Sequence, residues 1–238
     1  MTSVEFWSHW GWPLATAIIG FYFSFLVLRQ YFQRRKPQQL AWFVGLLLYA
    51  IAAFMESYSE YAQVWWPTVY RFYYVIAASL VGFLGLGTVY LVFRRKIWGH
   101  LFLVYLLVLV ALFLFSSLNA DLIQANLKPG ITVGGEAMPD SVRAYSFLFT
   151  IPGTFFLFGG AVYSVILFAA KREYAYRMWA NVLIAIGTTV IATAGGMART
   201  GRAVGLYPAE MVGAAFLLWG FLKAGTLRKS PERLRGQT

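Results

Sequence analysis

Long apolar stretches alternate with short polar connections along most of this 238-residue chain. A helix needs about 20 mostly apolar residues to cross roughly 30 Å of hydrocarbon. Seven stretches meet this requirement, and we expect each to form one transmembrane helix. They are residues 12–28, 40–57, 70–93, 97–118, 145–170, 178–198 and 207–227. The expected fold class is therefore all-α: a polytopic membrane protein whose residues 1–238 form a single seven-helix transmembrane domain.

Composition agrees with this interpretation. Hydrophobic residues make up 60% of the chain and charged residues only 12%, about half the charged share of a typical soluble domain. Aromatic residues contribute 19%, and Trp and Tyr concentrate where a bilayer meets water. No Lys or Arg precedes Arg29, so the basic start of a cleavable signal peptide is missing. We therefore expect the first stretch to be a retained helix.

The basic residues predict the orientation in a cell membrane. Fifteen of the 20 lie at one set of helix ends: Arg29, Arg34, Arg35, Lys36, Arg94, Arg95, Lys96, Lys171, Arg172, Arg177, Lys223, Arg228, Lys229, Arg233 and Arg235. Such ends face the cytoplasm, which places the N-terminus outside and the C-terminus inside. This asymmetry accounts for the net charge of +11. The charge therefore gives no reason to expect nucleic acid as a partner. Anionic lipid headgroups are the expected partners of the cytoplasmic face.

Two longer polar segments lie outside the apolar stretches, one between the fourth and fifth stretches and one after the seventh. Residues 119–144 form the longest connection, which this orientation makes extracellular. Its Pro129-Gly130 and Gly134-Gly135 pairs favour turns over regular structure, so it is either a lid or, as we expect, a loose loop. Residues 228–238 form a short basic cytoplasmic tail with no catalytic or signalling domain.

A weak internal match appears at a fixed offset of 137 residues. Trp42 matches Trp179, and the match continues between the third and seventh stretches. The residues there are Tyr70, Val75, Ala77, Ala78 and Leu80 against Tyr207, Val212, Ala214, Ala215 and Leu217. The first three helices would then repeat as the last three in a 3+1+3 plan with parallel repeats, as occurs in some transporters. Chance identity is the alternative, because membrane helices use few residue types.

The 3+1+3 plan is similar to that of sugar-type PQ-loop transporters, and seven helices with this orientation resemble microbial rhodopsins. The motifs of both families are missing. Pro37-Gln38 lies in the first cytoplasmic connection rather than within a helix. The last helix has only Lys223, within about a turn of Arg228, and no deep lysine for retinal. We assign the chain to neither family.

Ionisable and tyrosine side chains gather near the outer ends of the helices, and such groups inside a bilayer tend to mark function. The candidate ligand-binding residues are Glu56, Arg71, Tyr74, Glu210, Tyr49, Glu60 and Arg199. Glu56 and Glu60 are four residues apart and share a helix face. We expect a site for a cation, a proton or a small polar ligand there. The alternative is an ion-pair network that fixes the helices together.

Two further patterns have structural interpretations. Pro152-Gly153 in the fifth stretch predicts a bend, and thus a candidate hinge. The aromatic clusters Trp65-Trp66 and Tyr70–Tyr74 match the outer interfacial belt, with a pocket for a ring-bearing ligand as the alternative.

No catalytic pattern emerges, and we expect a protein that is not an enzyme. There is no Cys, which excludes thiolate chemistry. The two histidines, His9 and His100, lie near opposite ends of their segments and do not suggest one metal site. The sequence identifies no cofactor.

The preferred function is a transporter or channel-like protein that binds an ion or small ligand in an outer-leaflet vestibule. Two alternatives stay open. A receptor or sensor module would signal through a separate cytoplasmic partner, and an accessory subunit would belong to a larger membrane complex.

Overall fold

The computed structural model describes residues 10–129, 134–169, 175–199 and 205–226. Within these residues the chain is all-helical, with seven α-helices, one short 3₁₀ helix and no β-strand. The helices are α2 (Trp12–Arg34), α3 (Pro37–Ala62), α4 (Pro67–Val92), α5 (Ile97–Leu118), η2 (Gln124–Asn126), α6 (Asp140–Ala169), α7 (Ala175–Arg199) and α8 (Leu206–Thr226). Each of the seven α-helices coincides, within several residues at either end, with one predicted apolar stretch.

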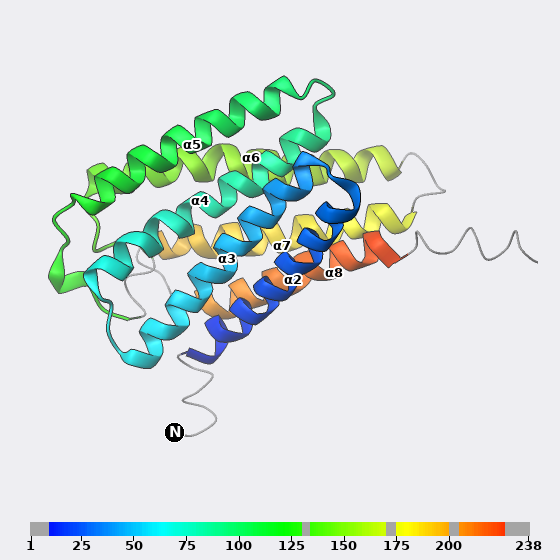
Figure 1. Cartoon of the computed structure of the whole chain (residues 1–238). Coiled ribbons are helices and arrows are strands. Elements are labelled where there is room, and N and C mark those ends of the chain that lie inside the picture. The colour runs from blue at the N-terminus through cyan, green and yellow to red at the C-terminus, as the bar shows by residue number, and fades with distance from the viewer. Residues whose placement is uncertain (1–9, 130–133, 170–174, 200–204, 227–238) are drawn as a thin grey trace, which may run out of the picture.

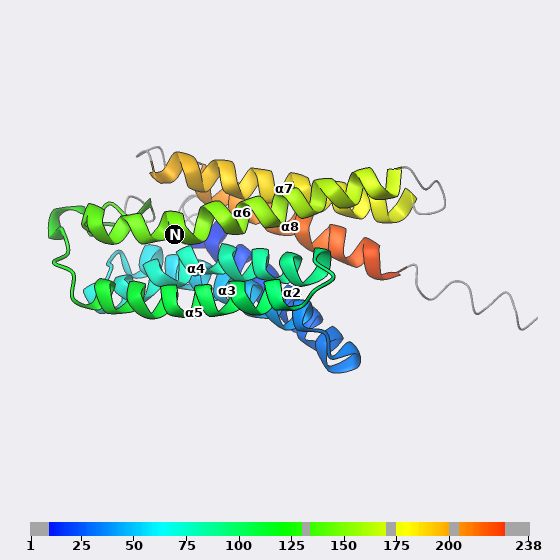
Figure 2. The same ribbon diagram turned by 90° about the horizontal axis from the view of Figure 1, so that it is seen from above.

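Six of the helices form a ring. The order of packing around it is α2, α3, α4, α6, α7 and α8, and α8 closes the ring against α2. Seen from above, α6, α7 and α8 lie in one layer and α2, α3, α4 and α5 in the other (Figure 2). Helix α5 stays outside the ring and packs mainly on α4 (Figure 1).

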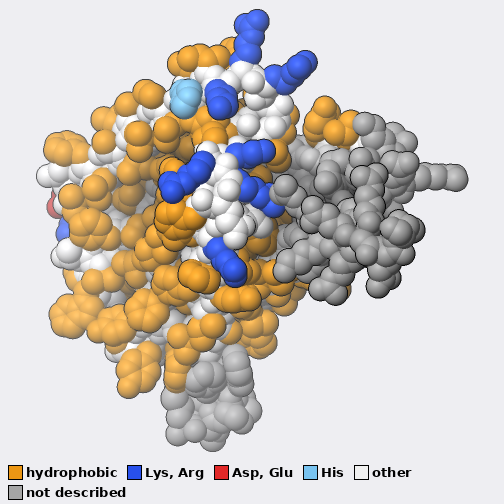
Figure 3. Space-filling model, turned by 45° about the vertical axis from the view of Figure 1, so that its right-hand side comes forward, with side chains coloured by type: hydrophobic (Ala, Val, Ile, Leu, Met, Phe, Trp, Pro, Cys, Tyr) orange, Lys and Arg blue, Asp and Glu red, His pale blue; other side chains and the backbone are white. Residues whose placement is uncertain are grey.

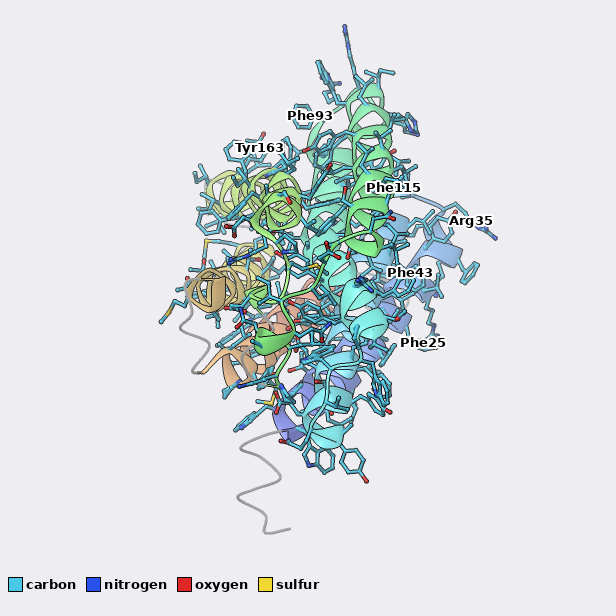
Figure 4. All side chains as sticks on the ribbon, turned by 90° about the vertical axis from the view of Figure 1, so that its left-hand side faces the viewer. Phe25, Arg35, Phe43, Phe93, Phe115 and Tyr163 are labelled. Atoms are coloured by element: carbon cyan, nitrogen blue, oxygen red, sulfur yellow. The ribbon has the colours of Figure 1, made fainter. Side chains whose placement is uncertain are left out.

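The outer surface of the bundle is apolar. Phe25, Phe115 and Tyr163 point away from it (Figure 4), with exposed fractions of 60%, 70% and 55%. In the described part of the chain, six helices, α2 to α7, are long and apolar enough to cross a membrane. Helix α8 carries Glu210 and Lys223 within its 21 residues and is not among them. An apolar exterior on long helices is stable in lipid rather than in water, so the chain is an integral, multi-pass membrane protein.

Short breaks separate α2, α3 and α4, and their sequence explains them. Arg35 and Gln63 end α2 and α3 in the left-handed conformation, with φ of 51° and 54°. Pro37 and Pro67 then open α3 and α4, where the missing N–H is not needed. The helices are longer than the apolar stretches, because polar residues such as Gln39 and Glu60 continue the helix beyond the hydrocarbon-like segment.

Lysine and arginine gather at one end of the bundle (Figure 3). We call it the basic end; here α2, α4, α6 and α8 end and α3, α5 and α7 begin. Its described basic residues are Arg29, Arg34, Arg35, Lys36, Arg94, Arg95, Lys96 and Lys223. The acids Glu56, Glu60, Asp121, Glu136, Asp140 and Glu210 all lie toward the opposite end.

The connection between α5 and α6 is packed rather than loose where it is described. Ala137 and Met138 are 0% and 1% exposed and belong to the core cluster that includes Phe113. The Ile123 N–H donates to the carbonyl oxygen of Ala137 at 2.9 Å. The expectation of a loose loop over residues 119–144 is therefore wrong for this part, and α6 already begins at Asp140.

The aromatic clusters are only in part an interfacial belt. Trp66 and Phe72 are 57% and 41% exposed, as a belt requires, but Trp65, Tyr70 and Tyr73 are at most 2% exposed. Their rings pack on one another, with Trp65 and Tyr73 centroids 4.7 Å apart. The belt interpretation is wrong for these buried members, which form the core beneath the α3–α4 connection.

Candidate functional site

A cavity of about 140 Å³ lies inside the ring, toward the end opposite the basic one. All six ring helices contribute to its wall. We call it the carboxyl cavity, after Glu56 and Glu210, its two ionisable carboxyl groups. Its other polar or aromatic lining residues are Tyr49, Tyr73, Tyr74, Thr150, Thr154, Thr188 and Phe23, and no Lys or Arg is among the described residues that line it.

Glu56 is the more buried of the two acids that line this cavity. Its residue is 4% exposed, and its Oε1 accepts a hydrogen bond of 2.6 Å from the Tyr73 hydroxyl. No donor among the described residues reaches its Oε2. A buried carboxylate oxygen without a donor carries a desolvation cost that a proton or a cation would relieve.

Glu210 on α8 is the neighbour of Glu56. The two carboxyl groups lie within hydrogen-bonding reach of each other. Glu210 is half-buried, and its backbone oxygen accepts a 2.9 Å hydrogen bond from Tyr49. When both groups are ionised, they repel each other, and neither can donate a hydrogen bond that would offset the repulsion. The arrangement is suited to holding either a proton or a cation between α3 and α8.

The spacing of residues on α4 positions Tyr73. Tyr70, Tyr73 and Tyr74 recur at i, i+3 and i+4, which places them on one side of the helix. Trp65 and Tyr70 pack against the ring of Tyr73, and this fixes its hydroxyl toward Glu56. Tyr74 lies one turn beyond Tyr70 and also lines the cavity, against Gly135 of the α5–α6 connection.

The remaining predicted candidates do not line the cavity. Glu60 is 5% exposed, and its Oε1 accepts a 2.8 Å hydrogen bond from Tyr207, which ties α3 to α8. Arg71 donates to the carbonyl oxygen of Ala120 at 2.7 Å, beside α5, and no ion pair joins it to a described acid. Arg199 is the last residue of α7, and its side chain lies outside the described residues. The structure thus brings together Tyr49, Glu56, Tyr74 and Glu210 from the predicted set.

Pro152 and Gly153 lie in α6, which runs through them without a break. Because Pro152 has no N–H, the carbonyl oxygen of Leu148 loses its helix donor. Tyr105 of α5 supplies the replacement, at 2.8 Å. Gly153 lets α6 approach α4 closely, since a Cβ there would lie 2.5 Å from the carbonyl oxygen of Val81. Whether the pair acts as a hinge stays a prediction.

A second cavity, of about 480 Å³, opens toward the basic end. We call it the basic-end cavity, and residues from all six ring helices line it. Five residues line both cavities, one from each of α2, α3, α4, α6 and α8: Phe23, Leu46, Leu84, Leu157 and Leu217. These five, here called the apolar layer, lie where the two spaces meet. Phe23 and Leu217 also belong to one core cluster with Leu46, against which Leu84 packs.

Two residues escaped the sequence interpretation. Tyr73 was grouped with interfacial aromatics, although its spacing from Tyr70 and Ala77 is that of a buried helix face. Thr188 of α7 is not among the predicted site residues, and it lines the carboxyl cavity. Among the described residues, no three His, Asp or Glu side chains lie close enough to hold a metal ion together.

No known protein family, curated protein or solved structure matches this chain. Any function must therefore be inferred from the geometry of the two cavities.

Proposed function

We propose that this protein is a non-catalytic membrane transporter that binds a small cation in the carboxyl cavity. One observation carries the proposal: Glu56 has an unpartnered oxygen, lies beside Glu210, and faces a cavity lined by no described Lys or Arg. Charge in a low-dielectric space needs a counter-charge. A cation that enters the cavity would supply it.

The surroundings favour a cation over a neutral or anionic solute. Tyr49 and Tyr73 use their O–H groups as donors to Glu210 and Glu56, so the lone pairs of their phenol oxygens are free to face a cation. Aromatic rings also attract positive charge. A cavity of about 150 Å³ admits a molecule the size of benzene, and about 140 Å³ fits an alkali cation with water or a small organic ammonium ion.

The two cavities support transport rather than binding alone. They lie at opposite sides of the apolar layer inside one ring of helices. Apolar constrictions close water-filled pathways by dewetting. The described structure then corresponds to a state in which Phe23, Leu46, Leu84, Leu157 and Leu217 close the route, and a rearrangement of the two helix triplets would open it.

Helix packing supports the 3+1+3 repeat. Shifting α3, Pro37–Ala62, by 137 residues gives 174–199, and α7 spans Ala175–Arg199. The same shift carries α2, α3 and α4 onto α6, α7 and α8. The helix contacts agree with this correspondence. Helix α2 packs on α3 and α8, and its counterpart α6 packs on their counterparts α7 and α4. A pseudo-two-fold axis would then pass between the triplets, where transporters built from repeats place their sites.

The proposed orientation follows from the basic end. Lys and Arg at the ends of α2, α4 and α8 favour the cytoplasm and the anionic headgroups of its leaflet. The carboxyl cavity then belongs to the outer half of the membrane, with the N-terminus outside and the C-terminus inside.

Flux measurements test the proposal. The full chain is reconstituted into liposomes, and uptake of radiolabelled tetramethylammonium is measured with sodium and potassium as competitors. Glu56→Gln keeps the shape of the side chain and removes its charge. A hydrogen bond to a charged group contributes about 1.5 to 3 kcal/mol, so we expect uptake to fall roughly tenfold or more.

Glu60→Gln is the matched control. Glu60 lies one turn from Glu56, is equally buried and also accepts a tyrosine hydroxyl, but it does not line the cavity. Its variant should keep uptake near the unmodified level. Equal uptake by folded Glu56→Gln protein and unmodified protein would overturn the assignment of Glu56.

An accessory role is a second candidate, favoured by α5. This helix lies outside the ring and contacts α4 far more than α6, and its free side exposes Leu101, Val104, Leu107, Val108, Leu112 and Phe115. Lipid or another membrane protein would cover this face. Gentle solubilisation that yields one stoichiometric larger assembly, together with no cation flux by the isolated chain, would favour the accessory role.

A further inference from the structure

The basic-end cavity contains polar groups that a cation pathway does not explain. Its described lining includes two basic residues and no acid, with six uncharged polar side chains. These are Arg34, Lys36, Gln30, Gln38, Gln39, Thr88, Ser164 and Asn181. A small cation is not attracted to such a wall, so the cavity calls for a different ligand.

Gln39 is the most informative of these side chains. It is 3% exposed, and it lies in the first turn of α3. Its Nε2 donates weakly to Gln30 Oε1, at 3.4 Å, and no donor among the described residues reaches its Oε1. A buried amide oxygen without a donor is unfavourable. A hydroxyl group on a ligand in the cavity would supply the missing hydrogen bond.

The charges at the mouth of the cavity indicate what else the ligand carries. Arg34 and Lys36 are exposed there, and the structure records no ion pair for either in the described part of the chain. Helix α3 begins between them and Gln39, and its N-cap, Lys36, makes no side-chain capping bond. The positive end of a long helix beside two cationic side chains favours an anion.

We propose that the basic-end cavity binds a phosphate ester that carries a free hydroxyl group, such as a glycerol phosphate. The phosphate lies at the mouth against Lys36, Arg34 and the first turn of α3. The hydroxyl donates to Gln39 Oε1. This chemistry has two sources, a soluble ester in the cytoplasm and the headgroup of a phospholipid. The site is independent of the cation site proposed above.

Binding of glycerol 3-phosphate to the purified full-length protein tests the soluble form of the ligand by calorimetry. Gln39→Leu removes the hydroxyl acceptor and should weaken binding roughly tenfold, while inorganic phosphate, which lacks the hydroxyl arm, should bind both proteins alike. Lys36→Ala should also weaken binding. Lys96→Ala is its control, because Lys96 is an exposed basic residue at the same end that does not line the cavity.

Nanodiscs of phosphatidylglycerol and of phosphatidylcholine distinguish the lipid source. If phosphatidylglycerol raises the melting temperature relative to phosphatidylcholine, and Gln39→Leu abolishes this difference, the lipid headgroup is the ligand of the site. Glu56→Gln should leave binding of either form unchanged, which separates this test from that of the cation site. Equal losses for Lys36→Ala and Lys96→Ala would indicate attraction by overall charge only and would overturn the proposal. So would the absence of binding by both glycerol 3-phosphate and phosphatidylglycerol.

Discussion

The two cavities lie in one ring of helices, yet they differ in size and charge. The carboxyl cavity is small, about 140 Å³, and contains two acids and no described base. The basic-end cavity is about 480 Å³ and contains Arg34 and Lys36 and no described acid. Only the five residues of the apolar layer line both. The difference shows that one scaffold can prepare two chemically opposite spaces by placing polar residues at opposite ends of the same helices.

The largest effect is expected from side-specific labelling, which asks whether the cavities open to opposite sides. Helix α6 contributes Thr154 to the carboxyl cavity and Ser164 to the basic-end cavity. The chain has no Cys, so Thr154→Cys and Ser164→Cys each introduce a single thiol of nearly native size. A membrane-impermeant thiol reagent should label Thr154→Cys only from outside and Ser164→Cys only from the cytoplasmic side.

Leu157→Cys, between these positions, reports on the apolar layer and should resist the reagent from both sides. Labelling of Thr154→Cys and Ser164→Cys from the same side would show that the two cavities are one compartment, and would contradict the proposed pathway.

The next effect concerns the apolar layer itself. Leu84 lines both cavities, and Leu84→Ser places a hydroxyl in the apolar layer, which excludes water in the proposed pathway. An apolar constriction that becomes polar is wetted more easily, so we expect a leak of small ions through reconstituted protein. Ion-sensitive dyes inside liposomes measure this leak. Leu91→Ser, two turns along α4, lines only the basic-end cavity and should leave the liposomes tight.

The sequence predicted the seven helices because each apolar stretch has a length that lipid dictates. It also selected Tyr49, Glu56, Tyr74 and Glu210 as candidates, because polar and ionisable groups are rare and costly at this depth, and the structure places all four on the carboxyl cavity. Arg71 is adjacent to Tyr70 in the chain, yet its guanidinium donates to the carbonyl oxygen of Ala120, just after the end of α5. Which way a residue at a helix end turns depends on the neighbouring helices, and no pattern along one segment contains that information.

The apolar layer and the role of Gln39 could not be predicted from the sequence, for a related reason. Leucine and phenylalanine fill every helix of this chain, so nothing marks Leu84 or Leu217 until the ring closes around them. Gln39 resembles an ordinary polar residue at the start of a helix. Only its burial, at 3% exposed, and its unpartnered oxygen separate it from Gln38 beside it.

A smaller effect follows from the hydrogen bond that distinguishes the carboxyl cavity. Tyr73→Phe removes the 2.6 Å bond to Glu56 and leaves both oxygens of that carboxyl group without a donor. Loss of a donor to a buried charged group costs about 3 kcal/mol. We expect a lower melting temperature in detergent and weaker tetramethylammonium binding, with glycerol 3-phosphate binding unchanged.

Tyr61→Phe serves as the control for Tyr73→Phe, because Tyr61 is 67% exposed on the preceding helix, where substitutions change stability by about 0.5 kcal/mol or less. Equal melting temperatures for the two variants would mean that the Tyr73 hydroxyl does not stabilise Glu56.

The smallest effect, a change in thermal stability, is expected from substitutions in α6. Residues of this helix line both cavities. Gly153→Ala adds a methyl group 2.5 Å from the carbonyl oxygen of Val81, so α6 and α4 must separate. Overpacking of this kind costs about 1 to 3 kcal/mol. Gly159→Ala, less than two turns away, meets no atom within 4 Å and should stabilise the helix by up to about 1 kcal/mol. Thermal unfolding of the two variants should therefore shift in opposite directions. If both shift upward, α4 and α6 are not held at the distance that seats Thr154 and Leu157 in the cavity walls.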